Sequence, residues 1–299
     1  MINKNLNKFI TFNEELPFED HVKETILKMR SVQKFSYLLN KSNITDQEIA
    51  DNFFKFFESY KSIHLFRNQA QILVFARNEQ TKKIEFNFIY NDNEIGLQEK
   101  IKSQLWLKDL WKLDMKADID FIHNTAQKKT IFNYINDVFL SYLQNYKNIP
   151  TIKSIYISGS AYSGKSYILN SLAKKAAING FSVVLLETPH LFNTMIKTFK
   201  ENNNYSQIVE EKLKNVDILF LDRLGDESRS EWFITNFLIS ILDYRLKNKK
   251  LTFFASEYPL KQLEKKYRKM YINEPNKINR FFKAIEILIY RDVSIGESK

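Results

Sequence analysis

One eight-residue loop constrains this chain more than any other feature. Gly159-Ser160-Ala161-Tyr162-Ser163-Gly164-Lys165-Ser166 matches the pattern G-x-x-x-x-G-K-[ST] in full, follows a short apolar run and opens a helical pattern. The backbone N–H groups of such a loop attract phosphate oxygens together with the helix N-terminus, and glycines permit their close approach. Because the chain has only six glycines, a chance match is disfavoured. We therefore expect a phosphate-binding loop that extends to Tyr167.

Two side chains of this loop have specific expected roles. Lys165 should reach the β- and γ-phosphates of a nucleotide, and the Ser166 hydroxyl should ligate Mg²⁺. Mg²⁺ needs a second protein anchor, which is expected at the end of a later buried strand. Asp222 directly follows the apolar run 218–221 and meets this expectation. Ser166 and Asp222 are the predicted metal ligands, and Lys165 and Asp222 are candidate catalytic residues.

The second half of the chain alternates short apolar runs with helical patterns. Helical patterns cover 165–178, 189–214 and 228–247, the middle one long enough for two helices. Each apolar run is too short for a helix and is bounded by polar or turn residues, which favours strands covered on both faces. Such alternation predicts a three-layer α/β domain with a parallel sheet. The predicted strands are Ile155–Ile157, Val183–Leu186, Ile218–Leu221, Leu251–Ala255 and Ile285–Ile289.

The first part of the chain predicts a smaller α+β domain. Thr45-Asp46-Gln47-Glu48 has the spacing of a capping box, and Ile49, Phe53, Phe54 and Phe57 follow on one helical face. Two β-rich runs at 71–77 and 83–90 predict a hairpin, and 133–146 predicts an amphipathic helix. We therefore expect an N-terminal domain over 1–97, a linker over 98–130 and the α/β domain over 131–299.

Composition excludes several classes of protein. No run of about 18 apolar residues occurs in the 299 residues, so we expect a soluble, cytoplasmic protein with no membrane partner. The absence of cysteine excludes disulfides, thiolate nucleophiles and every zinc site that uses Cys. The formal net charge is +10, from 45 Lys and Arg against 35 Asp and Glu.

Most of the positive charge lies in one stretch. Residues 247–283 hold 11 basic and three acidic residues. Within this stretch, 260–271 predicts an amphipathic helix that attracts phosphate backbones, with Tyr267 and Tyr271 available to stack on bases. A solvated helix face is the equally weighted alternative. The candidate DNA-binding residues are Lys261, Lys265, Lys266, Arg268 and Lys269.

Several segments resemble one known family. Leu221-Asp222-Arg223-Leu224-Gly225-Asp226-Glu227 is similar to that family's LDDIGAE, and Ile241-Leu242-Asp243-Tyr244-Arg245 is similar to its ILxYR. Leu251-Thr252-Phe253-Phe254-Ala255-Ser256-Glu257 is similar to its TFFTSN, and Arg280-Phe281-Phe282-Lys283 stands where it has R-x-x-E-R. With the phosphate loop, these matches cover 153–291 in the correct order. They resemble the bacterial replicative-helicase loaders of the AAA+ class, in the DnaC-like primosomal DnaI branch. A weaker likeness at Asn43-Ile44-Thr45-Asp46 concerns the family's helicase-binding N-terminal domain.

This resemblance implies a function and partners. Such loaders bind ATP with Mg²⁺ and deliver the hexameric replicative helicase onto single-stranded DNA, using the N-terminal domain to hold the helicase. It further implies that Asp222 is the Walker B anchor and that the protein self-associates on the helicase ring. The family's N-terminal zinc site is excluded as built, because no cysteine is present.

Three departures from the family concern hydrolysis. Arg223 replaces the second Walker B acid, Glu257 replaces the sensor asparagine, and Ala284 replaces an arginine that serves a neighbouring subunit. These groups act on the transition state of phosphoryl transfer, whereas the loop and Asp222 mainly bind the ground state. We therefore expect nucleotide binding with slow or absent hydrolysis. Glu227 is a candidate substitute acid, although its offset from Asp222 is unfavourable.

Three other functions are weighed beside the helicase loader. A catalytically silent P-loop adaptor would use nucleotide only to stabilise its fold. A transposition-helper ATPase shares the core motifs and would bind duplex DNA. A small-molecule kinase is disfavoured, because no arginine-rich lid follows the third predicted strand.

Overall fold

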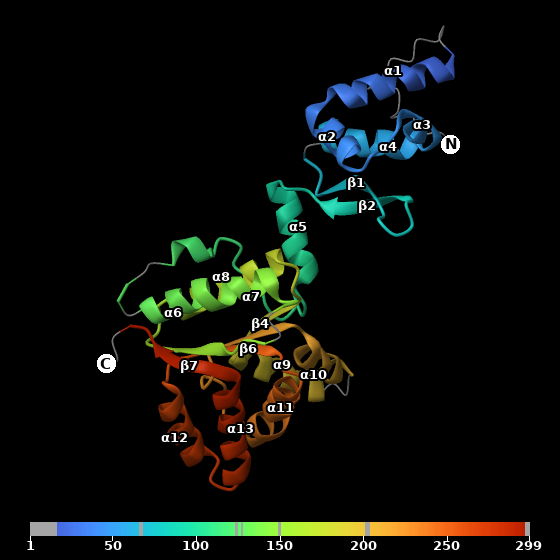
Figure 1. Cartoon of the computed structure of the whole chain (residues 1–299). Helices are drawn as coiled ribbons and strands as arrows, with labels where there is room; N and C mark the ends of the chain where they lie inside the picture. Colours follow the sequence, from blue (N-terminus) through green and yellow to red (C-terminus); the bar gives the residue numbers. More distant parts are fainter. Residues whose placement is uncertain are drawn as a thin grey trace. The chain divides into compact units, whose positions relative to one another are not determined.

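The computed structural model describes residues 17–65, 68–122, 125–126, 128–148, 151–200 and 204–296. The chain divides into two compact units between Glu99 and Lys100 (Figure 1). Residues 100–122, expected to belong to a linker, lie in the second unit, where Leu107, Leu110 and Leu113 are buried.

The N-terminal unit combines helices with a hairpin. In the part of this unit that the structure describes, four α-helices and a π-helical segment precede β1 and β2, which pair antiparallel with Gln71 opposite Tyr90. The capping box is confirmed: Glu48 N donates to Thr45 Oγ1 at 3.2 Å, and Thr45 N donates to Glu48 Oε2 at 3.0 Å. The elements are α1 Phe18–Ser31, α2 Gln33–Lys41, α3 Asp46–Asp51, α4 Phe53–Tyr60, the π-helical segment Lys61–Leu65, β1 Gln71–Arg77, β2 Ile84–Tyr90 and α5 Glu94–Gln104, which crosses the boundary in the sequence.

The helix predicted after Thr45 differs in its apolar face. A break at Asn52, with φ −119° and ψ 31°, separates α3 from α4. The break shifts the helical phase, so Phe56 is fully buried and Phe54 is 69% exposed. The prediction that Phe54 faces the core is therefore wrong.

The second unit is a three-layer α/β domain, as predicted. Its five strands are all parallel, in the order β4-β5-β6-β3-β7. Figure 1 shows α6, α7 and α8 on one side of the sheet and α9 to α13 on the other. The strands are β3 Ser154–Ser158, β4 Val183–Glu187, β5 Ile218–Asp222, β6 Leu251–Ser256 and β7 Ile289–Ser294. The helices are α6 Lys129–Tyr134, α7 Leu140–Asn145, α8 Lys165–Ile178, α9 Thr188–Lys200, α10 Tyr205–Asn215, α11 Ile239–Lys247, α12 Leu260–Met270 and α13 Pro275–Leu288, with π-helical segments Ile135–Phe139 and Phe233–Leu238 and a 3₁₀ turn Ile119–Phe121.

Both faces of the sheet are buried, because successive strand residues point to opposite sides. Val183 and Leu185 join the core under α8, whereas Val184 and Leu186 join the core under the other helix layer. Four of the five predicted strands are confirmed by this sheet. Within the described part of the chain, no helix is long and apolar enough to cross a membrane.

The fifth predicted strand is wrong. Residues 285–288 end α13, and the last strand begins at Ile289. Ile278, Phe281, Ile285 and Leu288 are all buried and recur at helical spacing. A short apolar run cannot by itself distinguish a buried strand from the end of a buried helix.

A buried arginine lies at the amino-terminal ends of the central strands. Arg245 of α11 has no exposed surface, and its guanidinium donates to Leu213 O at 2.9 Å, Val216 O at 2.8 Å and Leu251 O at 2.7 Å. Burial lowers the pKa of Arg245 to about 9. These bonds fix the end of α10 and the starts of β5 and β6.

Candidate nucleotide site

The phosphate loop connects β3 to α8 and holds its own lysine. Lys165 Nζ donates to Gly159 O at 2.8 Å and to Ser160 O at 2.7 Å. Gly159 has φ 154°, and a Cβ there would lie 1.9 Å from Ile295 O, so only glycine fits. Burial lowers the pKa of Lys165, although the carboxylates of Glu257 and Asp222 favour its charged form.

Asp222 ends β5 opposite this loop and is almost fully buried, with 1% exposure. Its Oδ1 accepts a hydrogen bond from Arg223 N at 2.8 Å, whereas its Oδ2 has no hydrogen-bond partner. Burial raises the pKa of Asp222, although the Ser166 hydroxyl, the Arg223 N–H group and the Lys165 ammonium favour the charged form. The Asp222 carboxylate thus presents an unsatisfied oxygen beside the loop.

A cavity of about 430 Å³ joins the loop to the carboxyl ends of the strands. Six loop residues line it, and acidic side chains surround a single arginine on the remaining wall. Its lining is Ala161, Tyr162, Gly164, Lys165, Ser166, Tyr167, Glu187, Asp222, Arg223, Asp226 and Glu257. Ligands of open α/β sheets bind at this edge.

The residues of this cavity fit a magnesium nucleotide. Ser166 and Asp222 offer a hydroxyl and a carboxylate, and Mg²⁺ is typically bound by one or two carboxylates together with phosphates and water. Asp222 Oδ2 is buried without a hydrogen-bond partner, so it has unused capacity toward a ligand. Among the described residues, no group of three or more His, Asp or Glu could hold a metal without such a ligand.

Comparisons with known proteins support the resemblance. No family model matches the chain. The replicative helicase loader DnaI of Bacillus subtilis is 22% identical over 268 residues, which are 82% of this chain and 80% of that protein. The replicative helicase loader DnaC of Buchnera aphidicola is 25% identical over 225 residues, 71% of this chain and 85% of that protein. This chain is related to the DnaI and DnaC replicative helicase loaders.

A solved structure supports the fold as well. The crystal structure of DnaI covers 65% of this chain and 98% of its own, with a TM-score of 0.54 and 23% identity. The expected AAA+ fold is therefore confirmed for this relative of the loaders.

The structure brings most predicted site residues of this loader relative together. Lys165, Ser166 and Asp222 converge on one cavity. The loop residues Gly159 and Ser160 contribute carbonyl oxygens that hold the lysine. Two departures from the family pattern, Arg223 and Glu257, also line the cavity.

Glu227 does not belong to this site, so its prediction as a substitute acid is corrected. It is 7% exposed and absent from the cavity lining. Its Oε2 accepts from Gly225 N at 2.8 Å and from Thr188 Oγ1 at 3.2 Å, and its Oε1 accepts from the Tyr267 hydroxyl. With both oxygens engaged in the core, the carboxylate is a structural anchor.

Two acidic residues that the sequence did not single out line the cavity. Glu187 ends β4 in register with Asp222, and Asp226 lies in the turn after β5. The signal that identifies Glu187 is its position, since it is the polar residue ending a buried strand adjacent to β5. Ala284, in contrast, is buried in α13, and Arg280 pairs with Asp243 at 2.7 Å.

The basic helix is confirmed, but its residues have different environments. Lys261, Lys265 and Lys269 are exposed on α12. Lys266 donates to Gly225 O at 2.7 Å, and Arg268 pairs with Glu264. Both are therefore engaged in contacts within the protein, which weakens their predicted DNA role.

The predicted stacking of two tyrosines on DNA bases is wrong. Tyr267 is 1% exposed and Tyr271 2% exposed, because both rings belong to the hydrophobic core on this side of the sheet. Their rings meet at a centroid distance of 5.5 Å and an angle of 90°. A base cannot reach either ring.

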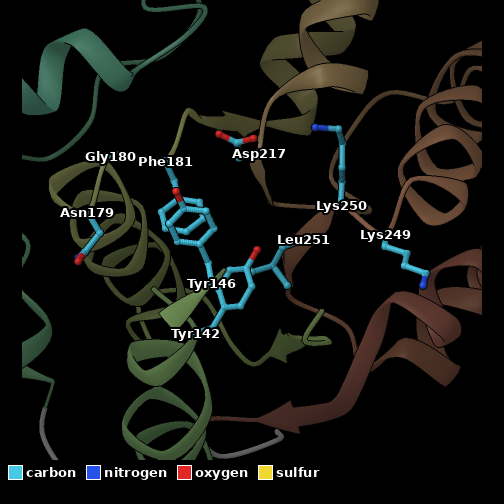
Figure 2. A pocket seen from close by; sticks show the side chains of 9 residues that line it. All are labelled: Tyr142, Tyr146, Asn179, Gly180, Phe181, Asp217, Lys249, Lys250 and Leu251. Atoms are coloured by element: carbon cyan, nitrogen blue, oxygen red, sulfur yellow. The ribbon is translucent and has the colours of Figure 1, made fainter. Parts of the chain in front are cut away.

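A second cavity, of about 240 Å³, lies at the amino-terminal edge of the sheet. Figure 2 shows the rings of Tyr142, Tyr146 and Phe181 gathered there beside Asp217 and Lys250. Asp217 Oδ2 accepts from Ser182 N at 2.9 Å and Ser182 Oγ at 2.7 Å, and Lys250 Nζ donates to Asn215 O at 2.6 Å. Asp217 and Lys250 are thus occupied, and the cavity lies at the opposite ends of the strands from the phosphate loop.

Proposed function

We propose that this protein is an ATP-binding helicase loader that delivers the replicative DNA helicase onto single-stranded DNA when replication begins. The observation that carries the proposal is the convergence of Lys165, Ser166 and Asp222 on one cavity of an AAA+ domain related to DnaI and DnaC. The names of these relatives favour a loader over a transposition-helper ATPase. The proposal places the protein in the cytoplasm.

The nucleotide of this proposal is ATP with Mg²⁺. The loop N–H groups and the start of α8 attract the phosphates, and Lys165 exchanges its carbonyl partners for β- and γ-phosphate oxygens. Ser166 and Asp222 would hold Mg²⁺, which would supply positive charge against the phosphates.

Hydrolysis of this nucleotide is proposed to be slow. Arg223 is a cation at the position where the family has an acid to orient water, and it cannot accept a proton from water. Glu257 places a carboxylate beside Lys165 where the family has an amide. Without an arginine at position 284, a neighbouring copy gains no finger from this part of α13. Nucleotide then acts mainly through binding, a property shared with the silent-adaptor alternative.

Helicase contact is proposed for the N-terminal unit. Phe18 and Phe54 are 54% and 69% exposed and stack on each other with ring centroids 6.5 Å apart. Exposed aromatic side chains in contact are typical anchors of protein interfaces. We assign this pair to the helicase, and the protein to self-association on the hexameric ring.

Single-stranded DNA contact is proposed for α12. The exposed ammonium groups of Lys261, Lys265 and Lys269 provide sequence-independent attraction to the phosphate backbone. With Tyr267 and Tyr271 buried, this contact rests on charge and not on base stacking.

Capture of the hexameric replicative helicase of the source organism tests the proposal. The full chain, with no nucleotide, ADP or ATP and Mg²⁺, should capture the helicase most strongly with ATP. The double variant Phe18→Ala and Phe54→Ala should lose capture, whereas Tyr37→Ala, which removes another exposed ring of the unit, should retain it. No capture under any condition, together with tight duplex DNA binding, would support the transposition-helper alternative. Equal capture of the helicase with no nucleotide, ADP or ATP would support the silent-adaptor alternative.

A further inference from the structure

Arg223 lines the nucleotide cavity and has a strained backbone conformation that hydrogen bonds hold in place. Its backbone has φ 57°, a left-handed conformation that disfavours residues with a Cβ. Two hydrogen bonds enforce it: Thr188 Oγ1 donates to Arg223 O at 2.7 Å, and Arg223 N donates to Asp222 Oδ1 at 2.8 Å. Backbone strain of this kind is typical of functional sites, and here it fixes the direction of the Arg223 side chain.

That side chain is held by two carboxylates of the cavity wall. Arg223 Nη1 lies 3.4 Å from Glu187 Oε2, and Arg223 Nε lies 3.2 Å from Asp226 Oδ2. The Arg223 side chain is 50% exposed, whereas those of Glu187 and Asp226 are 24% and 17% exposed, so solvent screens the guanidinium end of each pair. The guanidinium can therefore exchange them for a better anion at small cost.

The charges of the cavity show why an exchange is needed. Its lining holds four carboxylates, from Glu187, Asp222, Asp226 and Glu257, against two cations, Lys165 and Arg223. A γ-phosphate that enters beside the end of β5 meets the three carboxylates that do not ligate Mg²⁺. Arg223 is the cation paired with two of them, Glu187 and Asp226. A guanidinium binds phosphate oxygens through two parallel hydrogen bonds.

We infer that Arg223 is the residue that distinguishes ATP from ADP in this protein. In the nucleotide-free site, Glu187 and Asp226 retain its guanidinium at the rim. A γ-phosphate replaces them as its partner, whereas ADP leaves the two ion pairs intact. This inference rests on the proposed ATP binding and adds a specificity role that the family's acid at this position does not have.

Titration calorimetry with ATP and with ADP, each with Mg²⁺, tests this role by affinity alone. Wild-type protein should prefer ATP. Arg223→Ala should lower ATP affinity about 10- to 100-fold, the loss expected for a charge-assisted hydrogen-bonded pair, and change ADP affinity less than about threefold. Glu187→Gln should raise ATP affinity, because it removes a competing partner of the guanidinium.

Matched variants separate this role from general effects. Arg268→Ala removes an arginine that is also paired to a carboxylate and similarly exposed, but lies outside the cavity, so it should leave both affinities unchanged. Thermal melting without nucleotide checks that Arg223→Ala is folded, and Glu187→Gln tests the same exchange with the arginine intact.

The outcomes distinguish this inference from the proposed function. Equal losses of ATP and ADP affinity in Arg223→Ala, or ATP affinity unchanged in both variants, would overturn the role of Arg223 while leaving nucleotide binding established. A wild-type protein that binds neither nucleotide would overturn the proposed function and this inference with it.

Discussion

Lys165 Nζ donates a 2.8 Å hydrogen bond to the carbonyl oxygen of Gly159, six residues earlier in the same loop. Without nucleotide, the Lys165 ammonium thus donates its hydrogen bonds to its own loop. Bound phosphates would have to replace these carbonyl oxygens as acceptors. Lys165→Ala should abolish nucleotide binding, measured with a fluorescent ATP analogue, and should leave the melting temperature within a few degrees. Lys175→Ala, in the last turn of the same helix, should bind normally. Retained ATP affinity in Lys165→Ala would contradict the assignment of the loop.

The buried Asp222 carboxylate is expected to lower the stability of the nucleotide-free protein. Its Oδ2 is buried without a partner, and burial raises its pKa. Asp222→Asn removes the buried charge and should stabilise the nucleotide-free protein by about 1 kcal/mol, or roughly 2–4 °C in melting temperature. The same variant should lose the increase in ATP affinity that Mg²⁺ produces.

Asp292 provides the control for Asp222. Asp292 is partly buried and also has a raised pKa, but its oxygens accept from Leu260 N at 2.8 Å and Ser158 Oγ at 3.2 Å. Asp292→Asn should therefore bring no gain in stability. A stabilisation as large as that of Asp222→Asn would show that the missing partner of Oδ2 is irrelevant.

Glu227 should behave as a structural residue. Glu227→Ala leaves the N–H of Gly225 and the hydroxyl of Tyr267 without their acceptor in the core. We expect a loss of about 2–4 kcal/mol in unfolding free energy, measured by urea denaturation, with the ATP affinity of the folded protein unchanged. Glu231→Ala, at an exposed acid nearby, should cost little. Slower ATP turnover at unchanged stability would instead return Glu227 to the catalytic machinery.

The sequence predicts that the loop and Asp222 lie together, as they do in the cavity, because this signal is local. The loop from Gly159 to Ser166 is contiguous, and Asp222 follows directly on a buried strand, so motif and periodicity suffice. The acids around Arg223 are different. Glu187 and Asp226 lie close together only because β4 and β5 are neighbours in the sheet. The order of the strands cannot be predicted from any one segment of the sequence.

The errors have a common physical origin. The phase of α4 depends on one backbone break at Asn52, and the end of α13 depends on which layer buries Ile285. Tyr267 lies among basic residues in the sequence, which suggests base stacking, yet its hydroxyl donates to Glu227 in the core. Periodicity identifies apolar faces, whereas the tertiary partners decide which aromatic residues are buried.

The basic helix predicts a salt-dependent DNA contact. Charge reversal of Lys261, Lys265 and Lys269 to Glu should weaken binding of single-stranded oligonucleotides. It should also reduce the slope of log affinity against log salt by about 0.7 for each lost phosphate contact. Arg268→Glu, at a side chain already paired with Glu264, should have a smaller effect. Unchanged binding and slope in the triple variant would reject α12 as a DNA surface.

Acid stability of the N-terminal unit should depend on Glu48. The backbone hydrogen bond within the capping box at Thr45 and the bond from Arg77, whose Nη2 lies 2.8 Å from Glu48 Oε2, lower the pKa of Glu48 below its ordinary 4.5. A carboxyl with a lowered pKa in the folded state stabilises the protein fully above its ordinary value. That stabilisation is lost as the pH falls through the lowered value.

Glu48→Gln tests this assignment. The variant should be less stable than wild type by about 1 kcal/mol at pH 7, because the amide can keep the capping bond but loses the charge that attracts Arg77. This difference should shrink as the pH falls below the ordinary value of 4.5. Urea denaturation of the full chain at a series of pH values measures it. Glu79→Gln, an exposed acid in the hairpin turn, serves as the control and should follow the wild-type curve. If the difference in unfolding free energy is the same at pH 3 as at pH 7, the effect of Glu48→Gln comes from packing and not from the charge. The charge contribution has to shrink below the ordinary pKa, because the wild-type carboxyl then begins to bind a proton.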